Sequence, residues 1–187
     1  MLTGKNDVFD AFVRDMVALM DENRADEAQL IARGRQRLAA LVASDAWLPA
    51  EYRQTDPVQY RQYLLHRDAD RGFTVLSVAW GRGQYATPHN HKVWGIIGQL
   101  HGAELTQTYD DPQPGRPLVL RSSCVLRPGE TTAISPTLGD VHDVRNVGDG
   151  DSVSIHVYGG DLAALARLRN RFDAATGAVT PFLAQYH

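Results

Sequence analysis

Two histidines one residue apart, in the segment Thr87-Pro-His-Asn-His91, are the residues whose type and spacing most clearly suggest chemistry. On a β-strand, side chains at positions i and i+2 point to the same face, so the imidazoles of His89 and His91 could meet one ion. A bare His-x-His pair, however, is more often two exposed or hydrogen-bonded histidines. The surrounding sequence therefore has to decide between a metal site and an ordinary pair.

The residues around the pair resemble the two motifs of the cupin superfamily. The first motif reads Gly83-x5-His89-x-His91-x3-Gly95-x6-Gly102. The second motif reads Gly139-x2-His142-x3-Asn146. The glycines suit turns at the corners of a barrel, where the backbone needs a positive φ. The resemblance implies a metal site whose ligands are His89, His91 and His142.

Gly95 stands where cupins usually carry a glutamate ligand, and Glu104, the next acidic residue, has the wrong spacing. The implied ligands are three neutral imidazoles, which leave positions of the ion open for substrate and co-substrate. Because they leave the full charge on a divalent ion, they favour an anionic ligand such as a thiolate, whose soft sulfur prefers iron to magnesium or calcium. Imidazole suits iron, zinc, copper and nickel alike, so the residues alone do not select the metal.

A second pattern lies in the segment Ser154-Ile-His-Val-Tyr158, which alternates polar and apolar residues on a predicted strand. Ser154, His156 and Tyr158 share one face of that strand. This face could simply be the solvent-exposed side of a half-buried strand. It could also be a hydrogen-bonded row inside a barrel, in which the serine orients the histidine and the histidine orients the tyrosine. The pattern alone leaves both interpretations open.

Taken together, the three histidines, this row and the segment 87–95 resemble the thiol dioxygenases of the cysteine dioxygenase type I family, over about residues 60–158. The resemblance implies a small cupin barrel that holds mononuclear non-haem iron, Fe(2+), and oxidises a thiol to a sulfinic acid with both atoms of O₂. It implies that Tyr158, oriented by His156 and Ser154, is catalytic and hydrogen-bonds to bound oxygen or to substrate.

Within that family, the sequence departs from the animal enzymes. They carry a cysteine, thioether-linked to the tyrosine, where Gly95 stands here, and Cys124 is distant in sequence, so we expect no such crosslink. The segment around Gln62 looks like the bacterial branch that acts on 3-mercaptopropionate and uses a glutamine towards the substrate carboxylate. We therefore expect 3-mercaptopropionate to be preferred to cysteine.

In the bacterial branch, an arginine after the tyrosine strand helps to hold the substrate carboxylate. The candidates are Arg169 and Arg167, with Arg61 as a spare, and anchoring on Phe172-Asp173 and Thr176-Gly177 favours Arg169. Trp94 packs either near the barrel mouth or in the core. Three other classes stay open: cysteine dioxygenase proper, another metal-dependent cupin enzyme such as a carbon-cleaving dioxygenase, and a non-catalytic binding cupin. A carbon-cleaving enzyme has no need of the Ser-x-His-x-Tyr row, and binding cupins typically have eroded ligands.

The composition is that of an ordinary globular protein of 187 residues, with 19 Lys+Arg against 22 Asp+Glu and a net charge of -3. No strong basic excess favours nucleic acid or an anionic membrane as partner. One cysteine excludes a disulfide framework within the chain. Neither a signal-like start nor a run of about 20 apolar residues is present. We expect a cytoplasmic protein, monomeric or weakly homo-oligomeric, whose partners are a small thiol carboxylate and O₂.

These residues must be positioned by a mainly β fold, a cupin (double-stranded β-helix or jelly-roll barrel) with an N-terminal α-helical pair. Apolar spacings of three and four predict helices from about residue 7 to 20 and 26 to 42. Short apolar segments separated by turn residues predict strands at 73–80, 93–100, 103–109, 117–126, 131–135, 141–147 and 152–158. We expect one domain, 1–187, with helices in 1–45, the barrel and a C-terminal extension in 57–187, and a tail from Phe172 that forms a loop and a final strand.

Overall fold

The computed structural model describes residues 1–187 apart from 24–25, 166–167 and 183–187. Two helices, α1 (Asp7–Asn23) and α2 (Glu27–Val42), and a short 3-10 turn at Ala50–Tyr52 precede the strands. The strands are β1 (Arg61–Asp68), β2 (Phe73–Trp80), β3 (Tyr85–His89), β4 (Gly95–His101), β5 (Glu104–Tyr109), β6 (Leu120–Leu126), β7 (Thr131–Ile134), β8 (His142–Asn146), β9 (Ser152–Tyr158), β10 (Asn170–Phe172) and β11 (Val179–Pro181). A one-turn helix, α3 (Leu162–Leu165), follows β9. Among the described residues, none of the helices has the length and apolar character that crossing a membrane requires.

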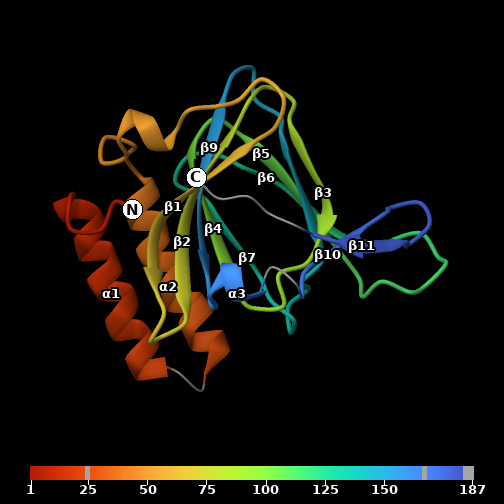
Figure 1. The fold of residues 1–187 in the computed structure, drawn as a ribbon, viewed down its shortest axis with the longest axis horizontal. Coiled ribbons are helices and arrows are strands. Elements are labelled where there is room, and N and C mark those ends of the chain that lie inside the picture. Colours follow the sequence, from red (N-terminus) through yellow and green to blue (C-terminus); the bar gives the residue numbers. More distant parts are fainter. Residues whose placement is uncertain (24–25, 166–167, 183–187) are drawn as a thin grey trace.

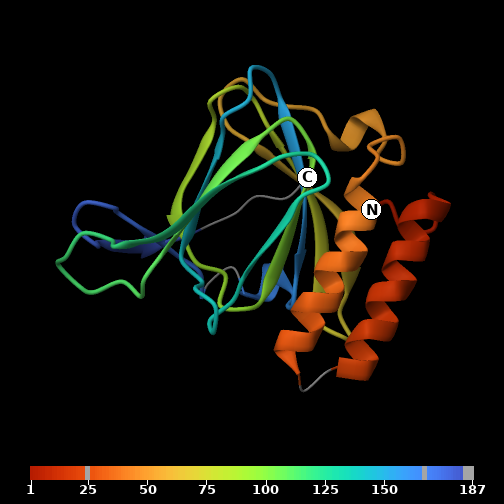
Figure 2. The ribbon, with the colours of Figure 1, turned by 180° about the vertical axis from the view of Figure 1, so that it is seen from behind.

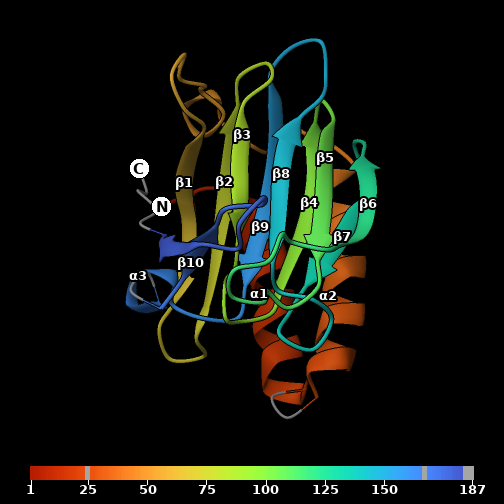
Figure 3. The same ribbon diagram turned by 90° about the vertical axis from the view of Figure 1, so that its right-hand side faces the viewer.

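The strands form two antiparallel sheets that face each other (Figures 1 and 3). One sheet has the order β1-β2-β9-β4-β7 and the other the order β11-β10-β3-β8-β5-β6. Between β2 and β9 the chain crosses repeatedly from one sheet to the other, which is the winding of a double-stranded β-helix. The predicted fold class, mainly β with an N-terminal helical pair, is confirmed.

The two helices cover the outer face of the five-stranded sheet, as Figure 2 shows. The chain makes room for α2 with a glycine on β4, because a Cβ at Gly98 would lie 2.9 Å from Cγ of Leu38. Asn6 Oδ1 accepts from Phe9 N at 3.0 Å and Asp26 Oδ1 from Gln29 N at 3.0 Å, so both helices begin at a side-chain cap. β9 therefore has apolar helices on one side and the barrel interior on the other.

The sequence missed some elements. β1 was not predicted, because it is an edge strand whose alternation is broken by a register shift between Leu64 and His66. The described part of the tail contains the expected strand, β11, but β11 pairs with a second short strand, β10, that was not expected. The four-residue helix α3 is also too short to leave a periodic pattern.

Candidate active site

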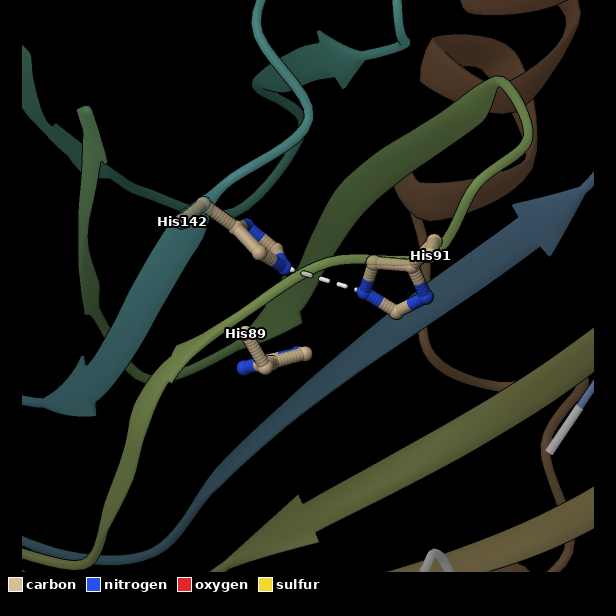
Figure 4. Close-up of side chains that lie close together, drawn as sticks. All are labelled: His89, His91 and His142. Atoms are coloured by element: carbon tan, nitrogen blue, oxygen red, sulfur yellow. Dashed lines mark hydrogen bonds between the residues drawn. The ribbon is translucent and has the colours of Figure 1, made fainter. Parts of the chain in front are cut away.

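Three histidines meet inside the barrel, and we call them the histidine cluster: His89, His91 and His142 (Figure 4). His89 ends β3 and His142 begins β8, and the two residues are direct partners in the antiparallel pairing. Each ring offers one nitrogen, and these nitrogens lie within 4.8 Å of one another. All three side chains are at most 5% exposed. The structure thus brings the three expected residues together.

The reason for this convergence differs in part from the expectation. His91 lies beyond the end of β3, so the rule of alternating strand faces does not place it. Instead, the carboxylate of Asp140 accepts from the backbone N–H of His91 at 2.8 Å and of Lys92 at 2.9 Å. Lys92 has a φ of 64°, which turns the chain sharply after His91. Asp140 precedes His142 by two residues and ties the two motifs together, a role that the sequence did not reveal.

The rings of the histidine cluster are neutral. Burial lowers the pKa of His142 to about 3 and holds the pKa values of His89 and His91 well below their usual range. The positive charge of Arg169 lowers all three further. His89 Nδ1 donates to the carbonyl of Thr87 at 2.8 Å, so its Nε2 carries the free lone pair. Neutral imidazoles with free lone pairs are the form that binds metals.

The spacing of the nitrogens fits a metal ion. Nε2 of His91 and Nε2 of His142 are 3.1 Å apart. Two imidazole nitrogens bound about 2.1 Å from an ion at a right angle would be about 3.0 Å apart. Nδ1 of His91 and Nδ1 of His142 are buried with no hydrogen-bond partner among the described residues, so neither ring is held by another group in a competing orientation. The cluster could therefore hold a metal through three nitrogens.

Gly95, at the position of the usual cupin glutamate, lies directly against the ring of Tyr158. A Cβ at residue 95 would be 2.8 Å from Cδ1 and Cε1 of that ring. The tyrosine in turn stacks on His91, with ring centroids 4.4 Å apart and an interplanar angle of 15°. A side chain at position 95 would therefore displace the tyrosine from the histidine cluster.

The segment 154–158 forms a continuous hydrogen-bonded row inside the barrel. Ser154 Oγ lies 2.8 Å from His156 Nε2, and His156 Nδ1 lies 2.8 Å from the hydroxyl of Tyr158. Burial lowers the pKa of His156 to about 3, so this ring is neutral as well. The opposite face of β9, with Ile155 and Val157, packs in the core that includes the helices. The structure therefore confirms the interpretation of these residues as a hydrogen-bonded row inside a barrel, and not as the solvent-exposed side of a half-buried strand.

Two of the expected substrate-binding residues, Gln62 and Arg169, line a cavity next to the histidine cluster. Arg169 is 2% exposed, and its Nε donates to the carbonyl of Asn90 at 3.1 Å. Arg61 pairs with Asp56 at 2.8 Å and does not line the cavity, so the structure does not support it as the spare candidate. Its neighbour Gln62 points the other way along β1, as strand alternation requires. Arg167 lies outside the described residues.

Sequence reasoning missed Phe182, which closes one wall of this cavity. Its ring stacks on His89, with centroids 4.7 Å apart and an angle of 9°, and the guanidinium of Arg169 lies 4.4 Å above it. Trp80, stacked on Tyr60 with centroids 4.3 Å apart, lines another wall. The cavity has a volume of about 20 Å³, which holds one water molecule, so a larger ligand requires its walls to move. No motif marks these aromatic residues in the sequence.

Two further expectations concern residues outside this cavity. Trp94 packs in the core between the helices and the five-stranded sheet, so the core alternative holds and the mouth alternative is wrong. Cys124 is exposed on β6. Since residue 95 has no side chain and Tyr158 is buried, the structure offers Tyr158 no cysteine to link with.

Solved structures that resemble this chain do so at low sequence identity, and no model of a protein family matches it. A protein with a double-stranded β-helix domain from Klebsiella pneumoniae subsp. pneumoniae MGH 78578 is 12% identical, with a TM-score of 0.48, over 72% of this chain and 93% of that one. A cupin superfamily protein from Desulfitobacterium hafniense DCB-2 is 15% identical, with a TM-score of 0.44, over 66% and 88%. A recombinant oxalate oxidase in complex with glycolate is 21% identical, with a TM-score of 0.45, over 57% and 53%. At this level the likeness concerns the fold and assigns no activity.

Proposed function

We propose that this chain is a non-haem Fe(II) thiol dioxygenase that oxidises a small thiol carboxylate to the sulfinic acid with O₂. 3-Mercaptopropionate is the preferred substrate and cysteine the second. The observation that carries the proposal is the row Ser154–His156–Tyr158, which ends with the tyrosine ring stacked on His91. A cupin that only binds a metal has no need of a buried hydrogen-bonding row beside it.

The histidine cluster would hold the iron through its ring nitrogens. When bound, Fe(II) lowers the pKa of a coordinated thiol and activates O₂ next to it. Because the cluster contains no carboxylate, the charge of the ion is not compensated by the protein. Such a site attracts anions, and a thiolate is the softest anion that a small metabolite offers.

The other residues of the cavity bind and orient the substrate. The charge of Arg169 reaches the cavity, since it lowers the pKa values of the neighbouring histidines. A buried guanidinium binds a carboxylate strongly and with fixed geometry. The amide of Gln62 can donate to the same carboxylate from the other sheet. These two groups hold the thiol end of a three-carbon chain in a defined position.

Tyr158 is the group that can exchange a proton with the reacting atoms. His156 fixes the tyrosine hydroxyl from one side, and either ring nitrogen of a neutral histidine can carry the proton. The hydroxyl can therefore donate to oxygen or accept from a thiol, depending on the tautomer of His156. The buried aromatic residues around it keep bulk water away during the reaction.

The experiment that tests this function measures O₂ uptake by the iron-loaded protein with 3-mercaptopropionate, cysteine and a simple diketone. We expect uptake with both thiols, a higher kcat/KM for 3-mercaptopropionate, and a sulfinate as product by mass spectrometry. A preference for cysteine would overturn the substrate assignment alone and indicate cysteine dioxygenase proper. Uptake with the diketone and none with thiols would overturn the thiol dioxygenase and favour a carbon-cleaving enzyme. No uptake with any compound would favour a binding cupin.

A further inference from the structure

The cavity beside the histidine cluster is too small for a substrate of the proposed function. Its volume of about 20 Å³ holds one water molecule. 3-Mercaptopropionate has as many non-hydrogen atoms as a phenyl ring, and protein interiors are packed too tightly to take up such a group without a displacement. At least one wall must therefore move before a thiol carboxylate reaches the histidines.

Most of the described walls are held by strands on both sides. The lining residues of β2, β3, β8 and β9 belong to strands that have a hydrogen-bonded neighbour on each side. β1, which carries Gln62, is an edge strand, but it pairs with β2 along its whole length, from Arg61 to Asp68. Residues on such strands move only when an extended ladder of backbone hydrogen bonds breaks.

Phe182 differs from these residues, because it directly follows a short edge strand. β11 has three residues, all exposed, and lies at the end of the six-stranded sheet. Among the described strands it pairs with β10 alone. The hairpin of β10 and β11 projects from the body of the barrel (Figures 1 and 2). The wall that contains Phe182 is thus the one most easily displaced.

β10, by contrast, is tied to the rest of the molecule. The N–H of Asn90 donates to the carbonyl of Asn170 at 3.1 Å, and the N–H of Asn170 donates to Asn90 Oδ1 at 2.8 Å. At the hairpin turn, the N–H of Leu118 donates to the carbonyl of Ala174 at 2.9 Å. We therefore expect β11 to separate from β10, and not the whole hairpin to leave the barrel.

Phe182 is held in place by one backbone hydrogen bond and by its ring. Its N–H donates to the carbonyl of Arg169 at 3.0 Å. Its ring is 2% exposed and stacks on His89, and the guanidinium groups of Arg169 and Arg171 lie 4.4 Å and 5.2 Å from the ring centroid. A carboxylate on Arg169 forms charged hydrogen bonds, which are stronger than the contact of a cation with a ring. A thiol carboxylate can therefore replace the contact that keeps the ring in place.

We propose that Phe182 is the movable wall of the cavity and the residue that decides which thiols reach the histidine cluster. The ring covers His89 and Arg169 while β11 lies on β10, and it leaves them when β11 separates. The space that the phenyl ring vacates then matches 3-mercaptopropionate in size. This inference rests on the proposed function for the identity of the ligand. Phe182 is a specificity-determining residue and takes no part in the bond changes.

The pairing of β11 allows this motion to be tested without altering the wall itself. The N–H of Asp173 donates to the carbonyl of Ala178 at 2.9 Å. Because antiparallel ladders alternate between bonded and non-bonded pairs, the pair Arg171–Thr180 is bonded as well. Val179 lies between these bonded pairs, so its N–H points away from β10. Thr180→Pro therefore removes a hydrogen bond between the strands, whereas Val179→Pro removes none.

The first test does not depend on activity. Diethyl pyrocarbonate modifies neutral imidazoles that it can reach, and mass spectrometry of the metal-free protein measures the rate at His89, His91 and His142. We expect this rate to rise about tenfold or more in Thr180→Pro and in Phe182→Ala, because the closed wall protects these rings. Val179→Pro should keep the wild-type rate. The exposed His101 should react equally fast in every protein.

Urea unfolding identifies a variant that has lost its fold, and Phe182→Leu replaces Phe182→Ala in that case. A wild-type rate in Thr180→Pro would overturn the motion of β11, and a rise in Phe182→Ala alone would show that Phe182 is a fixed wall. Equal rises in Val179→Pro and Thr180→Pro would overturn the motion as well, because separation of the strands would not be their cause.

The second test measures selectivity in the iron-loaded protein, as the ratio of kcat/KM for 4-mercaptobutyrate to that for 3-mercaptopropionate. Phe182→Ala should raise this ratio about tenfold, the effect of one methylene group in a pocket, and Phe182→Trp should lower it. Phe172→Ala is the matched control, because Phe172 is buried on β10 and does not line the cavity. An unchanged ratio in both Phe182 variants would overturn the role in specificity.

The movable wall and the proposed function fail separately. Histidine modification that responds as expected, without O₂ uptake from any thiol, would overturn the thiol dioxygenase and support the movable wall. O₂ uptake with thiols, without any response of the histidines to Thr180→Pro, would overturn the movable wall and leave the thiol dioxygenase in place.

Discussion

The histidine cluster and a second buried polar group, which consists of Gln99, Glu104 and Ser152 and is here called the Glu104 cluster, both lie next to the inward face of β9, but their polar atoms differ. The histidine cluster contains only neutral rings, and two ring nitrogens face each other at 3.1 Å. The Glu104 cluster contains a carboxyl surrounded by donors, at 2.5 Å and 3.2 Å from Oε1. Neutral ring nitrogens can bind a cation through their lone pairs, whereas a buried carboxyl among hydrogen-bond donors needs no cation. The same barrel interior thus holds two different polar groups, of which the histidines could hold a metal ion.

We expect the largest effect from a substitution that disrupts the histidine cluster alone. His142→Ala removes one of three ligands, and we expect iron binding and O₂ uptake to be lost, because two imidazoles seldom retain the ion. Elemental analysis after reconstitution with Fe(II) measures this. Glu104→Gln and the exposed His101→Ala should both retain the metal. Iron bound at wild-type stoichiometry by His142→Ala would show that the ion is held elsewhere.

The next effect separates chemistry from metal binding. Tyr158→Phe removes only the hydroxyl that His156 orients, so we expect kcat to fall by about 10²-fold with unchanged iron content. Tyr109→Phe is the matched control, because Tyr109 donates to Asp143 at 2.6 Å outside the cavity. Loss of iron in Tyr158→Phe would mean that the tyrosine supports the ligands and not the reaction.

A smaller effect concerns the substrate. Arg169→Ala should lower kcat/KM for 3-mercaptopropionate by about 10- to 100-fold, the value of a charged hydrogen bond, and should barely affect a thiol that has no carboxylate, such as ethanethiol. Arg61→Ala should leave both unchanged, because Arg61 pairs with Asp56 away from the cavity. Equal losses for the two thiols in Arg169→Ala would indicate a structural role beside Phe182.

The metal-free protein should be destabilised by acid through the histidines. The folded pKa values of His142 and His156, about 3, lie below the unfolded value of 6.5. Their contribution to stability is therefore present above pH 6.5 and is lost as the pH falls towards 3, by about 2 kcal/mol for each ring at pH 5. Urea unfolding of the Glu104→Gln variant at pH 7.5 and pH 5 measures the difference without the opposing contribution of Glu104. Equal stability at both would contradict the neutral state of these rings.

Glu104 should change the stability of the protein with pH in the opposite direction. Its folded pKa of about 7 lies above the unfolded value of 4.5, so stability is lost as the pH rises from 4.5 to 7. Glu104→Gln should avoid this loss, which amounts to at most about 3 kcal/mol. The variant should therefore gain stability relative to the wild type between pH 5 and pH 8 in the same urea experiment. A constant difference at the two pH values would show that Glu104 keeps its unfolded pKa.

The sequence was most informative where a local rule applies. Apolar residues at helical spacing identified α1 and α2, and alternation identified β9 and the shared face of Ser154, His156 and Tyr158. These patterns depend on neighbours within a few residues, so they can be read without the fold. Elements that depend on pairing partners, such as β1 and β10, left no comparable pattern.

The candidate site was predictable only in part for the same reason. The three histidines were found by motif resemblance, but the carboxylate of Asp140 that holds His91 and the ring of Phe182 on His89 come from segments with no motif. Glu104 was set aside as a metal ligand because of its spacing. Its place beside Ser152 follows from the pairing of strands in two sheets, which no local pattern encodes.

By itself, the sequence identified the side chains that the proposed chemistry uses, predicted a mainly β fold with two leading helices, and showed that position 95 has no carboxylate. The tertiary structure alone decided that both faces of β9 are buried, because the helices cover one face and the second sheet covers the other. It also placed Arg169 at the cavity and Arg61 away from it. Burial and long-range pairing depend on segments far apart in the chain, and they bring the polar residues of β9 and the three histidines into one buried interior.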